Sequence, residues 1–228
     1  MRLDKFLADC ALGSRSELKT VIKKGGVTVN SAVIKDPGFQ VSENDAITFS
    51  GQAVSYSPYI YIMMNKPKGV VSATEDSRQK TVLSLIDKKY DHYKLFPAGR
   101  LDIDTVGLLL ITNDGEMAHK ALSPKSHVEK TYYVETEKEI TNEDKIAFAE
   151  GVFIAGGTKT LPAKLEILSD KSAELTICEG KFHQVKLMFE SRGNKVTYLK
   201  RIKFGNLTLD ESLKEGEYRL LKDEERVF

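Results

Sequence analysis

Short runs of apolar residues with different periodicities divide the chain into predicted helices and strands. Between residues 17 and 24 the apolar side chains recur at helical spacing. Ser14 and Glu17 stand at the start of this segment in the S-x-x-E pattern of a helix-capping box. Strand-forming residues follow at 27–29 and 32–34, on either side of a polar tight turn. The start of the chain is therefore predicted to form a helix-helix-hairpin unit.

A change of pattern separates this unit from the rest of the chain. Residues 52–58 combine Ser, Tyr and Pro and are predicted to form a linker. Beyond it, the patterns predict strands at 59–64, 108–112, 130–136 and 173–178, and helices at 141–150 and 183–192. These elements interleave without a regular βαβ rhythm, which favours an α+β fold on a mainly antiparallel mixed sheet. We predict two domains, a small one at 1–58 and a larger one at 59–228.

The basic residues are concentrated in two segments of the chain. The 228 residues carry a net charge of only +1, which by itself favours no particular partner. Residues 1–24 hold six basic and three acidic side chains, and residues 179–205 hold seven basic and two acidic ones. Two cationic segments on a balanced chain indicate an extended polyanion such as nucleic acid, although ordinary solvated surface is the alternative.

Several common classes of protein lose support. No apolar run approaches the ~20 residues that cross a bilayer, and the N-terminus lacks a signal-peptide core, so we expect a cytoplasmic protein with no membrane partner. Cys10 and Cys178 lie far apart and outside any CxxC pair, which argues against a disulfide framework or a zinc site. The chain has no phosphate-binding loop, dinucleotide fingerprint, HExxH or GxSxG motif, and its four histidines lack metal spacing. We therefore expect no metal and no cofactor.

Two carboxylates stand out in the segment before an apolar run. Asp102 and Asp104 lie between Gly99 and Gly107, directly ahead of the apolar residues 108–111. A loop presented by a strand can hold a carboxylate in a cleft, which is a common place for catalytic groups. From the residues alone, however, an aspartate at such a place is more often a turn former or a cap. Asp104 fits this structural role better than Asp102 does.

The first quarter of the chain resembles the S4 RNA-binding domain. The resemblance rests on RLDKFLA at 2–8, SR at 14–15 and IKKGGVTVN at 22–30. In that family the second helix presents basic residues to RNA phosphates, as Arg15, Lys19 and Lys23 would here. Because such domains are attached to several kinds of protein, this resemblance implies RNA as a partner but no reaction.

Four further segments resemble, in order, the motifs of the RsuA branch of the pseudouridine synthases. They are NKPKGVVSAT at 65–74, GRLDIDTVGLLLITNDG at 99–115, EKTYYV at 129–134 and EGKFHQVKLMF at 179–189. With the S4-like start, the resemblance extends over nearly the whole chain. It implies a catalytic domain of the pseudouridine synthase fold behind the RNA-binding domain.

The resemblance implies roles for three side chains. Asp102, in the GRLD motif, would be the essential carboxylate, and Tyr132, in KTY, would stack against the target base. Lys186, in HQVK, would be the cation that pairs with the aspartate, at a position where most pseudouridine synthases carry Arg and the RsuA branch resembles this chain in carrying Lys. Lysine is a point charge and not a planar fork, so the orientation of Asp102 should depend more on its surroundings.

The residues alone leave structural alternatives open for these positions. Tyr132 could be a core aromatic of an alternating strand, and Lys186 could pair with Glu190 on its own helix. His183, one turn before Lys186, receives no role.

The implied reaction isomerises uridine. The N1–C1′ bond breaks, the base turns and C5 joins C1′, so no group is gained or lost and no cofactor is needed. The implied substrate is a specific uridine of small-subunit (16S) ribosomal RNA, free or in an assembling small subunit, and we expect a monomer. The alternatives are a related synthase acting on 23S ribosomal RNA or transfer RNA, and a non-catalytic RNA-binding factor of ribosome assembly.

RNA contacts are expected from basic residues in both parts of the chain. The expected set is Arg2, Lys5, Arg15, Lys19, Lys23, Lys66, Lys68, Arg100, Lys130, Lys181, Lys200 and Arg201. Lys66 and Lys68 could equally be plain surface lysines of a Pro-Gly turn, and they are included because that turn belongs to a family motif.

Overall fold

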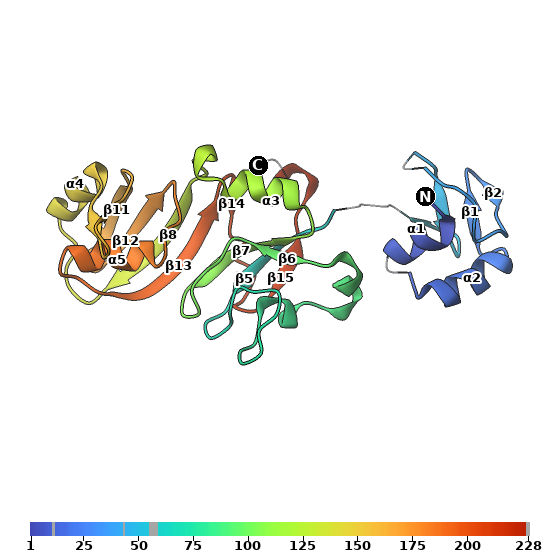
Figure 1. Ribbon diagram of the computed structural model, residues 1–228, viewed down its shortest axis with the longest axis horizontal. Coiled ribbons are helices and arrows are strands. Elements are labelled where there is room, and N and C mark those ends of the chain that lie inside the picture. The colour runs from blue at the N-terminus through green and yellow to red at the C-terminus, as the bar shows by residue number, and fades with distance from the viewer. Residues whose placement is uncertain (11, 43, 55–58, 227–228) are drawn as a thin grey trace. The chain divides into compact units, whose positions relative to one another are not determined.

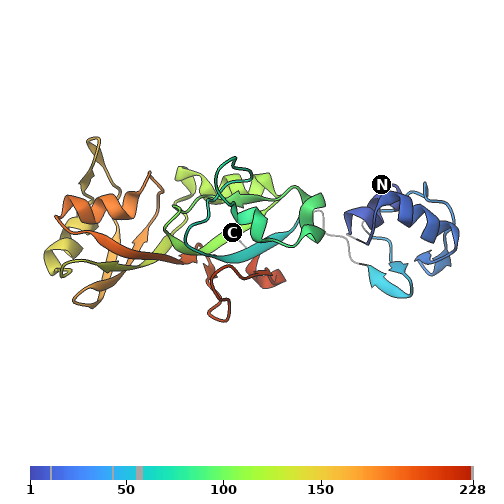
Figure 2. The same cartoon turned by 90° about the horizontal axis from the view of Figure 1, so that it is seen from below.

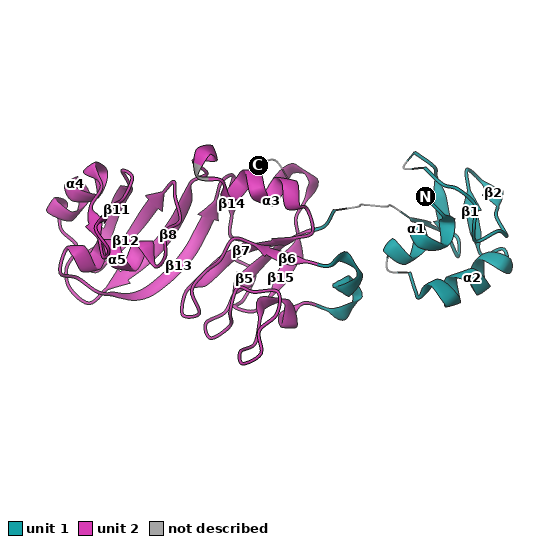
Figure 3. Cartoon of the chain, viewed as in Figure 1, with its two compact units in different colours: residues 1–60, 87–94 teal, residues 61–86, 95–228 magenta. Residues whose placement is uncertain are grey.

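The computed structural model describes residues 1–10, 12–42, 44–54 and 59–226. The chain divides into two compact units, one of Met1–Ile60 with Asp87–Lys94 and one of Tyr61–Ile86 with Leu95–Phe228 (Figure 3). Each unit has its own hydrophobic core. Among the described residues, none of the helices has the length and apolar character that crossing a bilayer requires.

The smaller unit is built from two helices and a four-stranded antiparallel sheet. The helices are α1 (Leu3–Asp9) and α2 (Arg15–Lys23), and the strands are β1 (Val27–Val29), β2 (Ala32–Val33), β3 (Ile47–Phe49) and β4 (Gln52–Val54), in the order β2-β1-β3-β4 (Figure 1). Asn30 and Ser31 both have positive φ, 49° and 69°, as a tight hairpin turn requires. The predicted helix-helix-hairpin arrangement is confirmed.

The predicted linker at 52–58 needs correction. Gln52–Val54 forms the edge strand β4. Ser50 and Gly51, both with positive φ, make a tight turn that brings these residues back alongside β3 as an antiparallel hairpin. Residues 55–58 lie outside the described part of the chain.

The capping box predicted for α2 is present. The Ser14 side chain accepts a hydrogen bond from the Glu17 amide, and the Glu17 carboxylate accepts one from the Ser14 amide at 2.9 Å. These bonds satisfy N–H groups at the helix start that have no partner within the helix. Leu18 and Ile22 then face the core of this unit, as their spacing predicts.

The larger unit is organised around a nine-stranded mixed sheet. Its main order is β11-β12-β8-β13-β7-β5-β15, with β14 beside β13 and β6 beside β7. The strands are β5 (Tyr61–Lys66), β6 (Phe96–Ala98), β7 (Val106–Thr112), β8 (Lys130–Thr136), β11 (Lys164–Ser169), β12 (Ser172–Ile177), β13 (Val196–Phe204), β14 (Leu207–Thr208) and β15 (Tyr218–Leu220). Only the pairing of β13 with β7 is parallel among these strands, so the prediction of a mainly antiparallel mixed sheet is confirmed.

Helices and short connections complete this unit. The elements are α3 (Gly115–Leu122), α4 (Asn142–Glu150), α5 (Gln184–Ser191), the hairpin of β9 (Phe153–Ile154) and β10 (Thr158–Lys159), and the 3-10 turns Val82–Leu85, Pro124–Ser126 and Asp223–Glu225. A further 3-10 turn, Lys88–Tyr93, belongs to the smaller unit. The helix α5 lies against β13 (Figure 2). All seven residues of the central strand β7 are buried, as its continuous apolar run predicts.

Candidate active site

The loop that carries Asp102 joins two neighbouring strands of the larger sheet. It follows β6 and leads into β7, which places it at one end of the central strand. Ser72 fixes the loop from outside: its hydroxyl donates to the Leu101 carbonyl at 2.9 Å and accepts from the Leu101 amide at 3.0 Å. Within the loop the Thr105 amide donates to the Asp102 carbonyl at 3.1 Å. The backbone around Asp102 is therefore held in one conformation.

A buried lysine binds the backbone of the same loop. The Lys66 side chain is fully buried, and its ammonium donates to the carbonyls of Pro67, Asp102 and Thr105 at 3.1, 3.1 and 2.9 Å. Burial disfavours the charged form most, against the attraction of the nearby carboxylates, and lowers the pKa of Lys66 to about 8. The prediction that Lys66 contacts RNA is wrong, because its charge is enclosed by the loop backbone and is not presented at the surface.

Lys186 on α5 joins two carboxylates of this loop. Its ammonium lies 2.9 Å from Oδ2 of Asp102 and 2.6 Å from Oδ1 of Asp104. Burial opposes the charge of Lys186, but the hydrogen bonds to Asp104 and Asp102 outweigh it, so the pKa of Lys186 is raised. For Asp104, burial is likewise outweighed by the bond from Lys186, and the pKa of this carboxyl is lowered.

This arrangement answers two of the structural alternatives. Within the described residues the ion pairs of Lys186 run to Asp102 and Asp104, and not to Glu190 on its own helix. The interpretation of Asp104 as a plain turn residue missed its ion pair, because nothing in the local sequence indicates that α5 lies opposite the loop.

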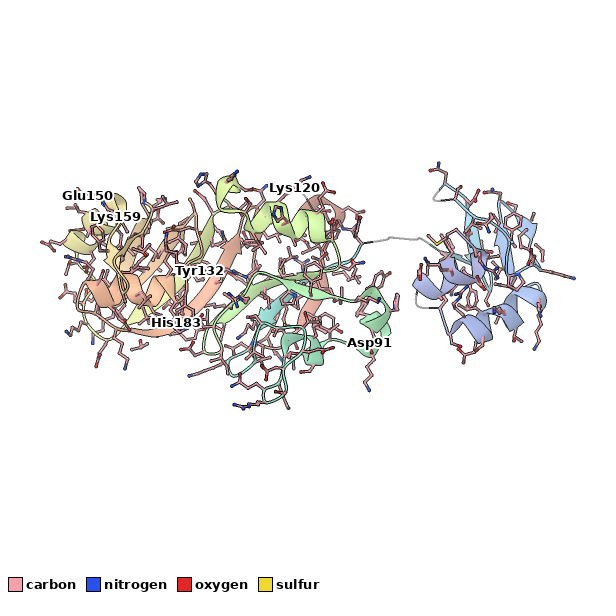
Figure 4. The ribbon with its side chains drawn as sticks, in the orientation of Figure 1. Asp91, Lys120, Tyr132, Glu150, Lys159 and His183 are labelled. Carbon is pink, nitrogen blue, oxygen red and sulfur yellow. The ribbon has the colours of Figure 1, made fainter. Side chains whose placement is uncertain are left out.

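A cleft opens beside the Asp102 carboxylate. The cleft is open to solvent, spans about 430 Å³ including that open space, and is lined by Arg100, Asp102, Tyr132, His183, Gln184 and neighbouring residues. Tyr132 reaches it from β8, between β12 and β13, with a side chain that is only 8% exposed. Figure 4 shows Tyr132 and His183 in the same region of the larger unit. The cleft therefore combines a carboxylate, a cation behind it and an aromatic wall.

His183, to which the sequence assigned no role, lies close to the carboxylate. Its backbone has φ 48° at the start of α5, and its Nε2 lies 3.6 Å from Oδ1 of Asp102. The imidazole also stacks on the ring of Phe182, with centroids 3.8 Å apart and planes 17° apart. Sequence reasoning missed this pair, although an aromatic directly before the histidine in the EGKFHQVK segment was the available signal.

Two more predicted RNA contacts need correction. Arg201 is only 2% exposed, and its Nε donates to the Leu108 carbonyl at 2.7 Å. Lys130 is 8% exposed, and its ammonium donates to the Val128 carbonyl at 2.8 Å. Burial first, and then the charge of Arg201, lower the pKa of Lys130. Both side chains are buried and donate to backbone carbonyls, so neither charge is presented at the surface to a phosphate.

The remaining predicted contacts lie in accessible places and stay predictions. In the smaller unit, Arg2, Lys5, Arg15, Lys19 and Lys23 are all exposed, and the guanidinium groups of Arg2 and Arg15 also pair with the buried Asp4. In the larger unit, Arg100 and Lys68 are exposed, and Lys181 and Lys200 are half-buried. Lys181 also pairs with Glu179 at the edge of the cleft.

The donor set of the cleft does not suggest a metal centre. Among the described residues, no group of three or more His, Cys, Asp or Glu side chains is arranged to hold a metal ion. The carboxylates next to the cleft are already bonded to the Lys186 ammonium.

The chain is similar to known proteins over nearly its whole length. Residues 60–191 match the family model described as RNA pseudouridylate synthase, and residues 1–47 match the model of the S4 domain. The "Uncharacterized RNA pseudouridine synthase YtzG" of Bacillus subtilis is 50% identical, with 99% of this chain and 96% of that protein covered. The "Ribosomal small subunit pseudouridine synthase A" of Vibrio cholerae is 45% identical, with 99% and 97% covered.

A solved structure extends the likeness to three dimensions. A crystal structure of a pseudouridylate synthase is 42% identical, covers 99% of this chain and 97% of its own, and superposes with a TM-score of 0.70. The predicted α+β fold, with an S4 domain ahead of a catalytic domain, is confirmed.

Proposed function

The chain belongs to the RNA pseudouridylate synthase family, and from this premise we propose that it isomerises one uridine of small-subunit (16S) ribosomal RNA with Asp102 as the catalytic carboxylate. It is an RNA pseudouridine synthase. The single observation that carries the role of Asp102 is its ion pair with Lys186 at the edge of a cleft walled by Tyr132.

The chemistry explains why a paired carboxylate suits this reaction. Breaking the N1–C1′ bond leaves electron deficiency at C1′, which an ionised carboxylate can stabilise or attack. The new C1′–C5 bond displaces the hydrogen of C5 as a proton, while N1 gains one. The Lys186 ammonium, 2.9 Å from Oδ2 of Asp102, supplies a positive charge beside the carboxylate for either route.

Tyr132 is proposed to hold the base while it turns. A uridine inside a helix cannot be reached by the carboxylate, so it must leave its stack. An aromatic ring replaces part of the lost stacking and excludes water from the cleft. The low exposure of Tyr132 supports this role, because a rigid ring positions a base better than a mobile one does.

The proposed substrate rests on the full-length relatives and on the charged surface. The Vibrio cholerae relative, named for the small ribosomal subunit, aligns with 99% of this chain, including the S4 domain. We propose that 1–58 binds the RNA and 59–228 performs the chemistry, in a cytoplasmic enzyme. All proposed catalytic groups come from one chain, which supports a monomer.

Two measurements test this proposal. Purified protein should release tritium from 16S RNA transcribed with [5-³H]uridine, since C5 loses its hydrogen. In cells, deleting the gene should remove one pseudouridine from 16S RNA. Loss of a mark from 23S or transfer RNA would overturn the substrate assignment. The absence of tritium release from every RNA would favour a non-catalytic binding factor.

A further inference from the structure

Phe182 presents an aromatic ring to solvent beside the candidate active site. Its exposure is 78%, and no large apolar side chain among the described residues is more exposed. It belongs to the segment between β12 and α5 that also supplies Gly180, Lys181 and His183 to the cleft. A single exposed apolar residue needs no explanation by itself. What distinguishes Phe182 from other exposed apolar residues is its position relative to Asp102.

The ring is tied to the catalytic carboxylate through one intervening side chain. The imidazole of His183 stacks on one face of Phe182, and His183 Nε2 lies 3.6 Å from Asp102 Oδ1. This stack fixes the plane of the Phe182 ring. With His183 on one face and 78% of the side chain exposed, the opposite face is open to solvent.

A flat, oriented and uncovered ring next to an RNA-modifying cleft fits a nucleobase. When a uridine is drawn out of its stack, the neighbouring base loses a stacking partner. Aromatic side chains that bind single strands replace such partners, and they accept any base because every base has a π-face. Arg100, exposed and lining the same cleft, supplies a positive charge for the backbone that joins the two nucleotides.

We infer that Phe182 stacks on an unpaired nucleobase directly adjacent to the target uridine and so positions the RNA for the reaction at Asp102. This inference rests on the proposed function and names an RNA contact outside the uridine site itself. Because the contact is made by stacking, the enzyme should tolerate any base at the flanking position, with a preference for the larger purine ring.

The competing explanation is structural, in which Phe182 only supports the imidazole of His183. Both explanations predict that F182A is impaired, so the test must involve the RNA as well as the protein. The chain offers a matched control in Phe153, which is also exposed, at 66%, and lies on β9 in the same unit, a strand that supplies no residue to the cleft.

The first measurement compares tritium release by wild type, F182A, F182W and F153A on the labelled 16S transcript. Loss of one base–aromatic stack should raise the KM of F182A by roughly 5- to 150-fold, with a much smaller change in kcat. F182W should stay near wild type, and so should F153A. An F182A enzyme with wild-type KM would overturn the inference.

The second measurement uses short RNAs that carry the mapped uridine with either a normal or an abasic flanking nucleotide. If Phe182 stacks on that base, its removal should impair wild type about as much as F182A does and should impair F182A no further. If, at both flanking positions, the abasic nucleotide impairs F182A by the same factor as it impairs wild type, the inference is wrong. Phe182 would then only support the imidazole of His183. A wild-type enzyme that releases no tritium from the full-length 16S transcript of the first measurement would overturn the proposed function, and this inference with it.

Discussion

Lys186 Nζ lies 2.9 Å from Oδ2 of Asp102, across 84 residues of sequence. The same ammonium lies 2.6 Å from Oδ1 of Asp104, so one lysine on α5 joins two carboxylates of one loop. A lysine cannot form the two parallel hydrogen bonds to a carboxylate that an arginine forms. Here the carbonyl bonds from Lys66 and the bonds of Ser72 to Leu101 hold the loop that presents Asp102.

Replacing Asp102 should separate catalysis from binding. D102N keeps the size of the side chain but removes the negative charge, so tritium release should fall by at least about 10⁴-fold. RNA affinity, measured by filter binding, should stay close to wild type. D104N is the matched control: its side chain is 52% exposed, and such a pair contributes roughly 1 kcal/mol or less, so kcat should change by no more than about tenfold. Full activity in D102N would remove Asp102 from the mechanism.

Lys186 is expected to act through its charge. K186M removes the cation next to Asp102, and kcat should drop by roughly 10²- to 10³-fold, the cost of losing one well-placed electrostatic partner. K186R keeps the charge and should exceed the methionine variant by at least about tenfold. Single-turnover rates with saturating enzyme measure both. Equal rates for wild type and K186M would show that the ion pair has no part in the reaction.

Tyr132 is expected to act through its ring. Y132A removes the aromatic wall of the cleft, and kcat/KM should fall by roughly 5- to 150-fold, the range for one base–aromatic stack. Y132F preserves the ring and should remain within about fivefold of wild type if stacking is the main contribution. A Y132F enzyme as impaired as Y132A would instead mean that Tyr132 contributes through its phenol hydroxyl.

Local patterns predicted the elements of the fold well. The capping box of α2, the strands β7 and β8, and the helices α4 and α5 all appear within about two residues of the predicted positions, because their periodicity and caps act over a few residues. The long strand β13 was not predicted. Its sequence, VTYLKRIKF, places Lys200 and Arg201 in the middle of a strand, and such charges indicate surface when read locally.

The site could be predicted only in part for the same reason. The ammonium of buried Lys66 and the Nε of buried Arg201 donate to backbone carbonyls of distant segments, and no sequence pattern encodes those partners. The proximity of Asp102 and Lys186 likewise depends on the packing of α5 against the loop. It was predicted through the family resemblance and not from spacing.

Exposed lysines of α2 should contribute to RNA affinity through the phosphates. Each phosphate contact contributes about 0.7 to 0.9 to the slope of log Kd against log salt concentration. The K19A/K23A double variant should therefore bind 16S RNA more weakly and with a slope reduced by roughly 1.4 to 1.8. The control is K120A, an exposed lysine of α3 that pairs with Glu116. An unchanged slope in the double variant would exclude these lysines from the RNA interface.

The enclosed charge of Lys66 predicts an unusual dependence of stability on pH. Its pKa is about 8 in the folded protein and near its ordinary value of 10.5 in the unfolded chain. Between these values the unfolded chain binds more protons than the folded one, so this group makes the free energy of unfolding rise with pH. The contribution is at most about 1.4 kcal/mol per pH unit. Below pH 8 both states are protonated and the group adds no slope.

K66M isolates this contribution because methionine does not titrate. Other groups titrate equally in both proteins, so the difference between their free energies of unfolding carries the effect of Lys66 alone. Urea denaturation from pH 7 to pH 10.5 should give a difference, wild type minus K66M, that is flat up to about pH 8 and then increases. A constant difference would mean that Lys66 keeps its ordinary pKa within the fold. In that case the bonds to the loop carbonyls would compensate fully for its burial.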